Sequence, residues 1–296
     1  MLTKSIATTI TTCRAECDAS HRNIIDEKIA IVMPVCNEGA TIEFTVSEIA
    51  RKLMRFLPNA LLFIFEDGSR DNTKEVIKRL SLKYDWIRPH DDEERKGYSK
   101  AVRDALVSID EDEFEYLLFM DSDGQYDPND FFKLWDAVID GAITRDEKLA
   151  RLCIVSARRV NRTEPPYRIF LSTGLRILER ILFNPQCNDV TSAFRVMDVS
   201  AAKAIASKVR FSEHNFWLEF TARASKEGYN FCEIPINYRC REWSYTYQAK
   251  KAKSNIYDIK VMPEIIKNEL GALTRTWLEY SRSSRRSQRS RRSKTR

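Results

Sequence analysis

From Lys28 onward, short apolar runs alternate with longer stretches of helical periodicity, and this alternation constrains the fold more than any other feature of the chain. Apolar residues spaced three and four apart from Ile42 to Leu57 predict an amphipathic helix, which Pro58 ends. The runs themselves are rich in Ile, Val, Leu and Phe, as buried strands are: Ile29–Met33, Leu61–Phe65, Tyr116–Met120 and Leu152–Val155. Strands that alternate with helices predict an α/β fold with a mostly parallel central sheet and right-handed crossovers.

The rest of the periodicity predicts elements that complete and cover this sheet. Helices are expected over 71–82, 98–109, 128–138, 165–183, 201–208 and 216–227. Short strands are expected over 194–197 and 230–236, the second of them broken by Pro235. The stretch 254–280 is amphipathic and predicts a further helix.

Composition and charge divide the chain into four segments. Of the 296 residues, 43% are hydrophobic and 31% are charged, which is globular composition and excludes a wholly disordered chain. The net charge is +6, but residues 281–296 carry eight cations and no acid, so the remainder sums to −2 and is not a basic nucleic-acid binder. We expect a flexible leader at 1–27, an α/β domain at 28–247, an amphipathic helical extension at 248–280 and a disordered Arg/Ser-rich basic tail at 281–296.

Two further patterns bear on where the chain works. No run of eighteen apolar residues occurs, so no segment is expected to span a bilayer. The seven cysteines are scattered, without the paired spacing of a zinc site or a disulfide framework. These features predict a reduced, cytosolic protein.

Acidic residues directly follow three of the apolar runs: Glu38, then Glu66 and Asp67, then Asp121 and Asp123. In an open α/β sheet, ligands bind outside the carboxyl ends of the strands, so these side chains should meet at one crevice. Carboxylates gathered in this way repel one another unless a cation offsets them. Their hard oxygen ligands predict a Mg²⁺ or Mn²⁺ site that binds a nucleotide diphosphate, whereas each acid alone could be an ordinary turn former.

Five motifs then give the chain a family resemblance. They are Pro34-Val35-Cys36-Asn37-Glu38, Glu66-Asp67-Gly68-Ser69-Arg70-Asp71-Asn72-Thr73, Lys96-Gly97-Tyr98-Ser99-Lys100-Ala101, Asp121-Ser122-Asp123-Gly124-Gln125 and Asp189-Val190-Thr191-Ser192-Ala193-Phe194-Arg195. In this order they resemble the motifs of family-2 glycosyltransferases of GT-A fold, and within that family the dolichyl-phosphate mannose synthases and polyprenyl-phosphate glycosyltransferases. The resemblance covers about residues 28–247. No phosphate loop of ATPases and no dinucleotide-binding glycine motif occurs.

The resemblance implies site residues position by position. Asp121 and Asp123 hold the metal on the donor diphosphate, Asp67 reads the base, and Gln125 faces the sugar or the acceptor. The implied catalytic set is Asp123, Gln125 and Glu219. The implied nucleotide-sugar site comprises Pro34, Cys36, Glu38, Glu66, Asp67, Asp121, Ser122, Asp123, Arg159 and Arg239.

Some of these assignments leave alternatives open. Arg159 matches the arginine of the family's Gly-Thr-Arg segment, but Arg158 stands beside it. Arg239 matches the first arginine of a phosphate-gripping loop whose glycine and lysine are absent here, with Arg241 or Lys250 as possible substitutes. Ala193 stands where the family has glycine, which an ordinary backbone angle would tolerate.

The expected reaction is transfer of mannose or glucose from a GDP- or UDP-linked sugar to a polyprenyl or dolichyl phosphate, with inversion at the anomeric carbon. A lipid phosphate oxygen is already anionic near neutral pH and needs no general base, whereas a sugar hydroxyl acceptor would need one. Glu219 matches a recurrent glutamate of the family's acceptor-side helix. Its alternative role is that of a solvated residue that complements the helix dipole.

Partners follow from this expectation. A polyprenyl acceptor lies in a bilayer, so we expect peripheral attachment at the cytosolic face of a membrane, either to an anionic surface or to a membrane-embedded partner subunit. The alternative for the stretch 254–280 is that it packs on the body and leaves the tail solvated. Two other functions stay open: a transferase with a sugar hydroxyl acceptor, and an inactive fold that binds RNA or protein through its Arg/Ser tail.

Overall fold

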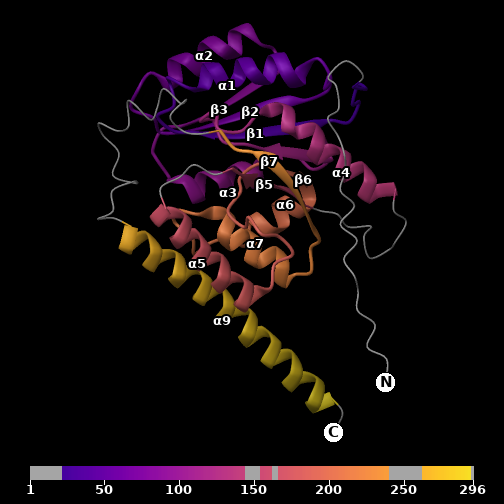
Figure 1. The fold of residues 1–296 in the computed structure, drawn as a ribbon, viewed down its shortest axis with the longest axis vertical. Helices are drawn as coiled ribbons and strands as arrows, with labels where there is room; N and C mark the ends of the chain where they lie inside the picture. The colour runs from indigo at the N-terminus through magenta and orange to yellow at the C-terminus, as the bar shows by residue number, and fades with distance from the viewer. Residues whose placement is uncertain (1–21, 144–153, 162–165, 240–261, 295–296) are drawn as a thin grey trace.

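Seven strands form one sheet through the centre of the molecule (Figure 1). Their bounds are β1 Ile29–Val35, β2 Leu61–Asp67, β3 Ile87–Asp92, β4 Tyr116–Phe119, β5 Ile154–Val160, β6 Arg195–Asp198 and β7 Phe231–Asn237. They lie in the order β3-β2-β1-β4-β6-β5-β7. The structure is a computed structural model that describes residues 22–143, 154–161, 166–239 and 262–294.

The expected mostly parallel sheet is confirmed. β1 pairs in parallel with β2 and β4, β2 with β3, and β5 with β7. Only β6, among the described strands, runs against its neighbours β4 and β5. Every residue of β1 is buried, because the strand has a partner on each edge and helices over both faces.

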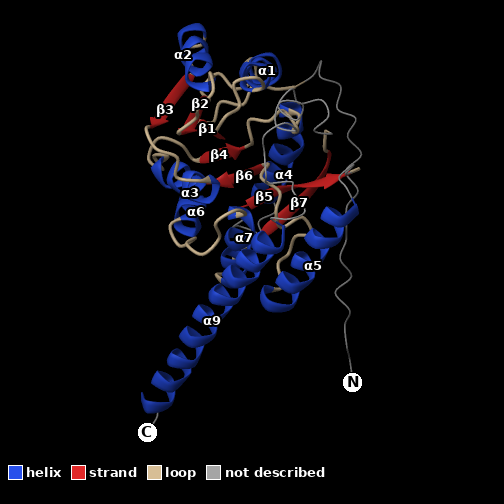
Figure 2. Cartoon of the chain, turned by 90° about the vertical axis from the view of Figure 1, so that its left-hand side faces the viewer, coloured by secondary structure: helices blue, strands red, loops and turns tan. Residues whose placement is uncertain are grey.

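Helices cover the sheet on both faces. Their bounds are α1 Ile42–Ile49, α2 Thr73–Lys83, α3 Tyr98–Ser108, α4 Phe131–Ile143, α5 Pro166–Phe183, α6 Val199–Ala206, α7 Phe216–Lys226 and α9 Met262–Lys294, with a π-helical turn η2 at Ala50–Met54 and a 3₁₀ turn η3 at Pro128–Asp130. Helices α1 and α2 pack together over one side of the sheet, and α3, α6 and α7 pack together over the other (Figure 1). Helix α9 runs beside α5 and α7 and extends away from the body (Figure 2).

The order of the strands fixes where a ligand site can form. The chain goes from β1 outward to β2 and β3 and then returns to β4 on the opposite side of β1. The strand order therefore reverses between β1 and β4, and open α/β sheets bind ligands at the carboxyl ends of the strands where such a reversal occurs. The loop after β2 lies next to this point of reversal, because Val35 at the end of β1 pairs with Glu66 of β2.

Three local features differ from the sequence predictions. Strand β3 was not predicted, because Ile87 is its only buried residue and an edge strand needs little apolar pattern. Pro235 does not break β7, since β7 is the other edge of the sheet and a missing N–H is tolerated there. The helix predicted to start at Pro128 starts instead as the turn η3, where the Asp127 side chain accepts a hydrogen bond from the Asn129 N–H.

The C-terminal helix is longer than the predicted extension. Helix α9 continues to Lys294, so the boundary expected at residue 281 is not a break in its secondary structure. Its start lies at Met262, and the segment 240–261, with Arg241 and Lys250, lies outside the described residues. Residues 1–21 of the predicted leader lie outside them as well.

Candidate functional site

The loop after β1 is held at the start of α1 by Glu38. Pro34 is buried in β1 and Cys36 is half-buried just after it. Glu38 is 8% exposed, its Oε2 accepts a hydrogen bond from Thr41 Oγ1 at 2.6 Å, and its backbone N–H donates to Thr73 Oγ1 at 2.9 Å. Glu38 therefore helps to fix the path of the loop to which it belongs.

The loops after β1 and β2 are bound to each other. The Asn37 N–H donates to Ser69 Oγ at 2.8 Å, and the Arg70 N–H donates to Asn37 Oδ1 at 2.8 Å. Glu66 is 2% exposed, accepts from the Ser69 N–H at 2.5 Å, and lies 3.3 Å from Lys74 Nζ. Two of the predicted motifs thus form one rigid unit beside the carboxyl ends of the strands.

Asp67 extends this unit to the loop before α3. Its two carboxylate oxygens accept the backbone N–H groups of Lys96 at 2.5 Å and Gly97 at 3.0 Å. Gly68 has φ +58°, and a Cβ at this position would lie 2.5 Å from the backbone nitrogen of Arg95, so only glycine allows the two loops to approach so closely. The side chain expected to read the base therefore also shapes the wall of the site through its backbone partners.

Asp121 and Asp123 follow β4 at the point where the strand order reverses. Asp121 Oδ1 accepts a hydrogen bond from the Tyr98 hydroxyl at 3.2 Å, and Asp123 Oδ1 accepts from the Gln125 N–H at 3.1 Å. Both carboxylates are half-buried. Burial, together with the charge of Asp121, raises the pKa of the Tyr98 hydroxyl well above its ordinary value, so this hydroxyl stays a donor.

The residues present fit a Mg²⁺ or Mn²⁺ ion that shares its coordination with a ligand. Within the described ranges no cluster of three or more His, Cys, Asp or Glu side chains could hold a metal ion by itself. Two half-exposed carboxylates suit an ion that takes its other oxygens from phosphates and water. The backbone of the loop between them is anchored, because Ser122 is buried and its carbonyl accepts from Thr45 Oγ1 at 2.8 Å.

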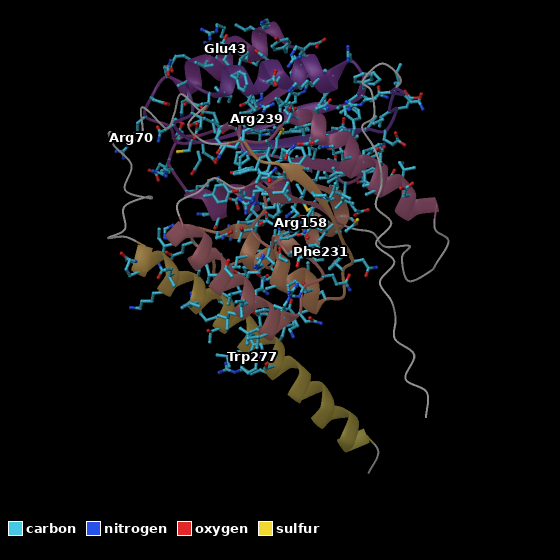
Figure 3. All side chains as sticks on the ribbon, viewed as in Figure 1. Glu43, Arg70, Arg158, Phe231, Arg239 and Trp277 are labelled. Atoms are coloured by element: carbon cyan, nitrogen blue, oxygen red, sulfur yellow. The ribbon has the colours of Figure 1, made fainter. Side chains whose placement is uncertain are left out.

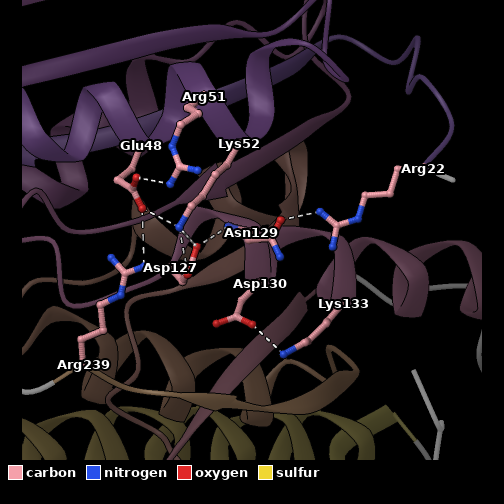
Figure 4. A network of polar contacts seen from close by, with 9 residues as sticks. All are labelled: Arg22, Glu48, Arg51, Lys52, Asp127, Asn129, Asp130, Lys133 and Arg239. Atoms are coloured by element: carbon pink, nitrogen blue, oxygen red, sulfur yellow. Dashed lines mark hydrogen bonds and ion pairs between the residues drawn. The ribbon is translucent and has the colours of Figure 1, made fainter. Parts of the chain in front are cut away.

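Gln125 and Arg239 form a second contact region. Gln125 is 4% exposed, its Nε2 donates to the Arg239 carbonyl at 3.1 Å, and the Arg239 N–H donates back to the Gln125 carbonyl at 3.0 Å. The Arg239 guanidinium lies 2.6 Å from Asp127 Oδ2 and 3.5 Å from Glu48 Oε2, and Lys52 bridges the same two acids (Figure 4). The arginine expected to grip phosphate is thus already paired with carboxylates.

Arg158 and Arg159 both lie within β5, near its end, and Arg159 is the one whose guanidinium is held by several hydrogen bonds. Its guanidinium makes two hydrogen bonds to the Asp189 carboxylate and a third to Thr191 Oγ1 at 2.7 Å. The Arg158 side chain is 45% exposed, and its Nε lies 3.9 Å from Glu233. The pairing joins the end of β5 to the motif that begins at Asp189.

Glu219 lies in the interior of the protein. It is 0% exposed and accepts the backbone N–H groups of Phe211 at 2.7 Å and Ser212 at 2.8 Å, with Arg210 N at 3.2 Å. Arg223, one turn later in α7, pairs with it at 2.7 Å. The solvated alternative for Glu219 is wrong, and its contacts give it the role of an anchor for the loop before α7.

Tyr98 belongs to one of the five motifs, but no role was predicted for it from the sequence. Trp217 lies outside the motifs and was not predicted as a site residue. Trp217 Nε1 donates to the Tyr98 hydroxyl at 3.2 Å, and the Arg195 guanidinium carbon lies 4.5 Å from the centre of the Trp217 ring. Trp217 therefore contacts residues of two motifs. The sequence does contain a signal for the burial of Trp217: the residues Phe216–Phe220 around Glu219 are apolar, which is not typical of a solvated helix.

Comparison with known proteins gives the family. The family described as "Glycosyl transferase family 2" matches residues 30–205 of this chain, which is more than half of its length. The chain belongs to this family, as its five motifs predicted.

Three similar curated proteins are glycosyltransferases by name, and two of them are named for the transfer of a sugar to a polyprenyl or dolichyl phosphate. The chain is 25% identical over 239 residues to a polyprenol monophosphomannose synthase of Mycolicibacterium smegmatis, covering 78% of this chain and 83% of that protein. It is 26% identical to the glycosyltransferase AglD of Haloferax volcanii, over 71% of this chain and 33% of that protein. It is 24% identical to a dolichyl-phosphate β-glucosyltransferase, ALG5C, of Trichomonas vaginalis, over 70% of this chain and 62% of that protein. The chain thus spans about a third of AglD and less than two thirds of ALG5C.

Solved structures give the same fold. Glucosyl-3-phosphoglycerate synthase from Mycobacterium tuberculosis, solved with UDP, matches with a TM-score of 0.56 and 16% identity, over 85% of this chain and 80% of that one. Mannosyl-3-phosphoglycerate synthase from Rubrobacter xylanophilus matches with a TM-score of 0.56 and 12% identity, over 86% and 75% of the two chains. The mycobacterial enzyme was also solved with Mn²⁺. These likenesses confirm the GT-A fold.

Proposed function

We propose that this protein moves a hexose, mannose or glucose, from a GDP- or UDP-linked donor to a polyprenyl phosphate, with inversion at the anomeric carbon. The observation that carries the proposal is the position of Asp121 and Asp123, at the reversal point of the sheet and beside the joined loops after β1 and β2. The lipid phosphate acceptor is supported by the similarity to polyprenol monophosphomannose synthase, which extends over most of both chains.

On the donor side, the proposal assigns the nucleoside to the surface made by the loops after β1 and β2, and the diphosphate to Asp121 and Asp123. Pro34, Cys36 and Glu38 face the base and ribose, and Asp67 reads the base. Glu66 and Ser122 fix the loops around them. A bound Mg²⁺ or Mn²⁺ would offset the negative charge that develops on the leaving diphosphate. Asp121 and Asp123 are the residues that would hold this ion and, through it, the donor diphosphate.

The chemical step is a single displacement at the anomeric carbon. An oxygen of the acceptor phosphate forms a bond to this carbon while the bond to the diphosphate oxygen breaks, and the electron pair leaves with the nucleoside diphosphate. The acceptor oxygen carries its own negative charge, so no side chain needs to remove a proton. The proposal assigns Gln125, whose side chain donates to the Arg239 carbonyl, to the side from which the acceptor enters. Arg159 makes no direct contact with the donor in this proposal, and its role is to hold the motif that begins at Asp189 in place.

The proposal places the acceptor side at a membrane surface. No helix within the described parts of the chain is long and apolar enough to cross a bilayer. Helix α5 leaves Ile177 and Ile181 53% and 74% exposed, and Arg176 and Arg180 beside them are exposed too. Apolar residues flanked by arginines suit the surface of an anionic bilayer at its cytosolic face.

Helix α9 also exposes apolar residues at this end of the molecule. Trp277 is 37% exposed, and in Figure 3 it lies at the opposite end of the body from Glu43 of α1. Leu270 and Leu278 are exposed to a similar extent. Helix α9 packs beside α5. The proposal assigns peripheral attachment to the exposed apolar residues of these two helices, together with the arginines of α5.

The experiment is a transfer assay with labelled GDP-mannose and UDP-glucose, with and without a polyprenyl phosphate in detergent or vesicles. We expect an organic-soluble labelled product only when polyprenyl phosphate and Mn²⁺ or Mg²⁺ are present, and none from Asp123→Ala. A water-soluble glycan product formed without polyprenyl phosphate would replace the lipid acceptor by a sugar hydroxyl. If neither donor is consumed under any condition, while the chain binds RNA through its C-terminal residues, the adaptor alternative replaces the enzyme.

A further inference from the structure

The Tyr98 hydroxyl lies between a candidate metal ligand and the protein core. It donates to Asp121 Oδ1 at 3.2 Å and accepts from Trp217 Nε1 at 3.2 Å. We infer that Tyr98 is a positioning residue, which holds the Asp121 carboxylate in the orientation that binds the metal-bound donor diphosphate. This inference rests on the proposed function, because it concerns the same site.

The direction of the Tyr98 proton follows from counting donors. An indole nitrogen can only donate, so the hydrogen bond from Trp217 uses a lone pair of the Tyr98 oxygen. The single hydroxyl proton must then point to the other partner, which is Asp121. Asp121 Oδ1 is therefore an acceptor, as a carboxylate ready to bind a cation has to be.

Trp217 is well suited to fix this arrangement because the core holds it on several sides. It is 1% exposed, its ring packs edge-on against Phe119 with centroids 4.7 Å apart, and Phe216 and Phe220 pack at 5.1 and 5.2 Å. The Arg195 guanidinium covers it at 4.5 Å. Phe119 is also the last residue of β4, two positions before Asp121.

Arg195 is itself immobilised. It is 0% exposed, and it donates to the carbonyls of Ser192 at 2.8 Å and Val190 at 3.0 Å. The orientation of Asp121 is thus set by a chain of contacts that runs from the motif of residues 189–195 through α7 to α3. A ligand carboxylate held in place before the diphosphate arrives loses less side-chain freedom on binding, which strengthens the metal-dependent part of the affinity.

The experiment measures the Kd of GDP and UDP by calorimetry on the full chain, once with Mn²⁺ and once with EDTA. Tyr98→Phe removes only the hydroxyl, and Tyr116→Phe is the matched control, since Tyr116 lies at the opposite end of β4 from Asp121. We expect Tyr98→Phe to weaken the Mn²⁺-dependent binding about tenfold and to leave the binding in EDTA unchanged. Tyr116→Phe should change neither value.

Two further variants separate positioning from packing. In an Asp121→Asn background, Tyr98→Phe should cause no further loss of Mn²⁺-dependent binding, because the carboxylate that it orients is gone. Trp217→Phe keeps the Tyr98 hydroxyl but no longer directs its proton, and should weaken the Mn²⁺-dependent binding roughly threefold. Trp217→Phe also serves as the test if Tyr98→Phe does not fold.

The results that overturn the inference are distinct from those that overturn the proposed function. If wild-type protein binds a nucleotide more tightly with Mn²⁺ and Tyr98→Phe binds it equally well, the positioning role is wrong. An equal loss in Mn²⁺ and in EDTA also contradicts it, because a structural effect on the loop would act in both. If no nucleotide binds the wild-type protein with Mn²⁺, the proposed function itself fails, and the inference fails with it.

Discussion

The Arg159 guanidinium holds the Asp189 carboxylate with two parallel hydrogen bonds, Nη2 to Oδ1 at 2.7 Å and Nε to Oδ2 at 2.8 Å. Their side chains are only 10% and 8% exposed, so the pair is shielded from water. A two-pronged contact of this kind is available to arginine but not to lysine. It fixes the start of the Asp189 motif against the end of β5.

Arg159→Lys should lower the free energy of unfolding by about 2 kcal/mol, because at least one charge-assisted hydrogen bond is lost. The matched control is Arg158→Lys at the neighbouring exposed position, where we expect a change of about 0.5 kcal/mol or less. Urea denaturation of both variants measures these values. Equal effects at the two positions would show that the contact between Arg159 and Asp189 does not stabilise the protein more than an exposed arginine does.

Glu219→Gln should destabilise the protein by about 3 kcal/mol or more, because an amide puts a donor among backbone N–H groups and leaves Arg223 without its buried partner. The measurements are the melting temperature of the variant and its rate of sugar transfer per folded molecule. Glu213→Gln in the preceding loop, where the side chain is exposed, is the control. A Glu219→Gln protein that melts like the wild type and yet transfers no sugar would show that the main role of Glu219 is catalytic and not structural.

Glu269 should make stability depend on pH. Burial raises the pKa of Glu269 to about 7, against the hydrogen bonds from Ser212, His214 and Asn215, and the charge of Glu219 adds to the shift. The ordinary value is 4.5, so the folded state holds a proton that the unfolded state loses between about pH 4.5 and 7. The contribution of this group to stability is therefore fully favourable below that range and falls as the pH rises through it, by about 3 kcal/mol in total.

The measurement is the difference in unfolding free energy between wild type and Glu269→Gln, taken at pH 5 and pH 8. Relative to the wild type, the variant should gain stability as the pH rises. Glu264→Gln, at an exposed position of the same helix, should show no such trend. A constant difference between wild type and Glu269→Gln at the two pH values contradicts the assignment.

Exchange of Ile177 and Ile181 for glutamate should weaken sedimentation with anionic vesicles at least tenfold, because it removes two apolar contacts and adds charge that the lipid repels. Leu82→Glu is the control, since Leu82 is 83% exposed on α2, across the sheet from α5. Binding should also weaken as salt rises. Vesicle binding that tolerates both isoleucine changes would place the attachment surface elsewhere.

Much of the fold could be predicted because apolar periodicity is local information. The central strands and the main helices follow from it, and the acidic loops follow from their positions after the strands. β3 escaped prediction because Arg88, His90 and Asp91 lie exposed on an edge strand that carries almost no apolar pattern. An edge strand is held mainly by backbone pairing, which leaves little trace in side-chain type.

For the candidate site, the sequence predicts residues but not the contacts that these residues make. The sequence does not reveal that Arg239 pairs with Asp127 and Glu48, because these partners come from distant segments. For Glu219 a signal was present, since Arg223 follows it by one helical turn and an ion pair at that spacing can be inferred. The burial of that pair depends on the packing of α7 under α9, which local sequence does not encode.

The central claim is that Asp121 and Asp123 bind a nucleoside diphosphate together with a divalent cation, and a thermal-shift panel tests it most directly. The wild-type protein is heated with GDP, UDP, GDP-mannose and UDP-glucose, each with Mn²⁺ and with EDTA, and the panel is repeated on Asp123→Ala. We predict that at least one nucleotide raises the melting temperature of the wild type with Mn²⁺, that EDTA removes most of this rise, and that Asp123→Ala lacks it. A rise of equal size in EDTA, or in Asp123→Ala, would contradict the claim.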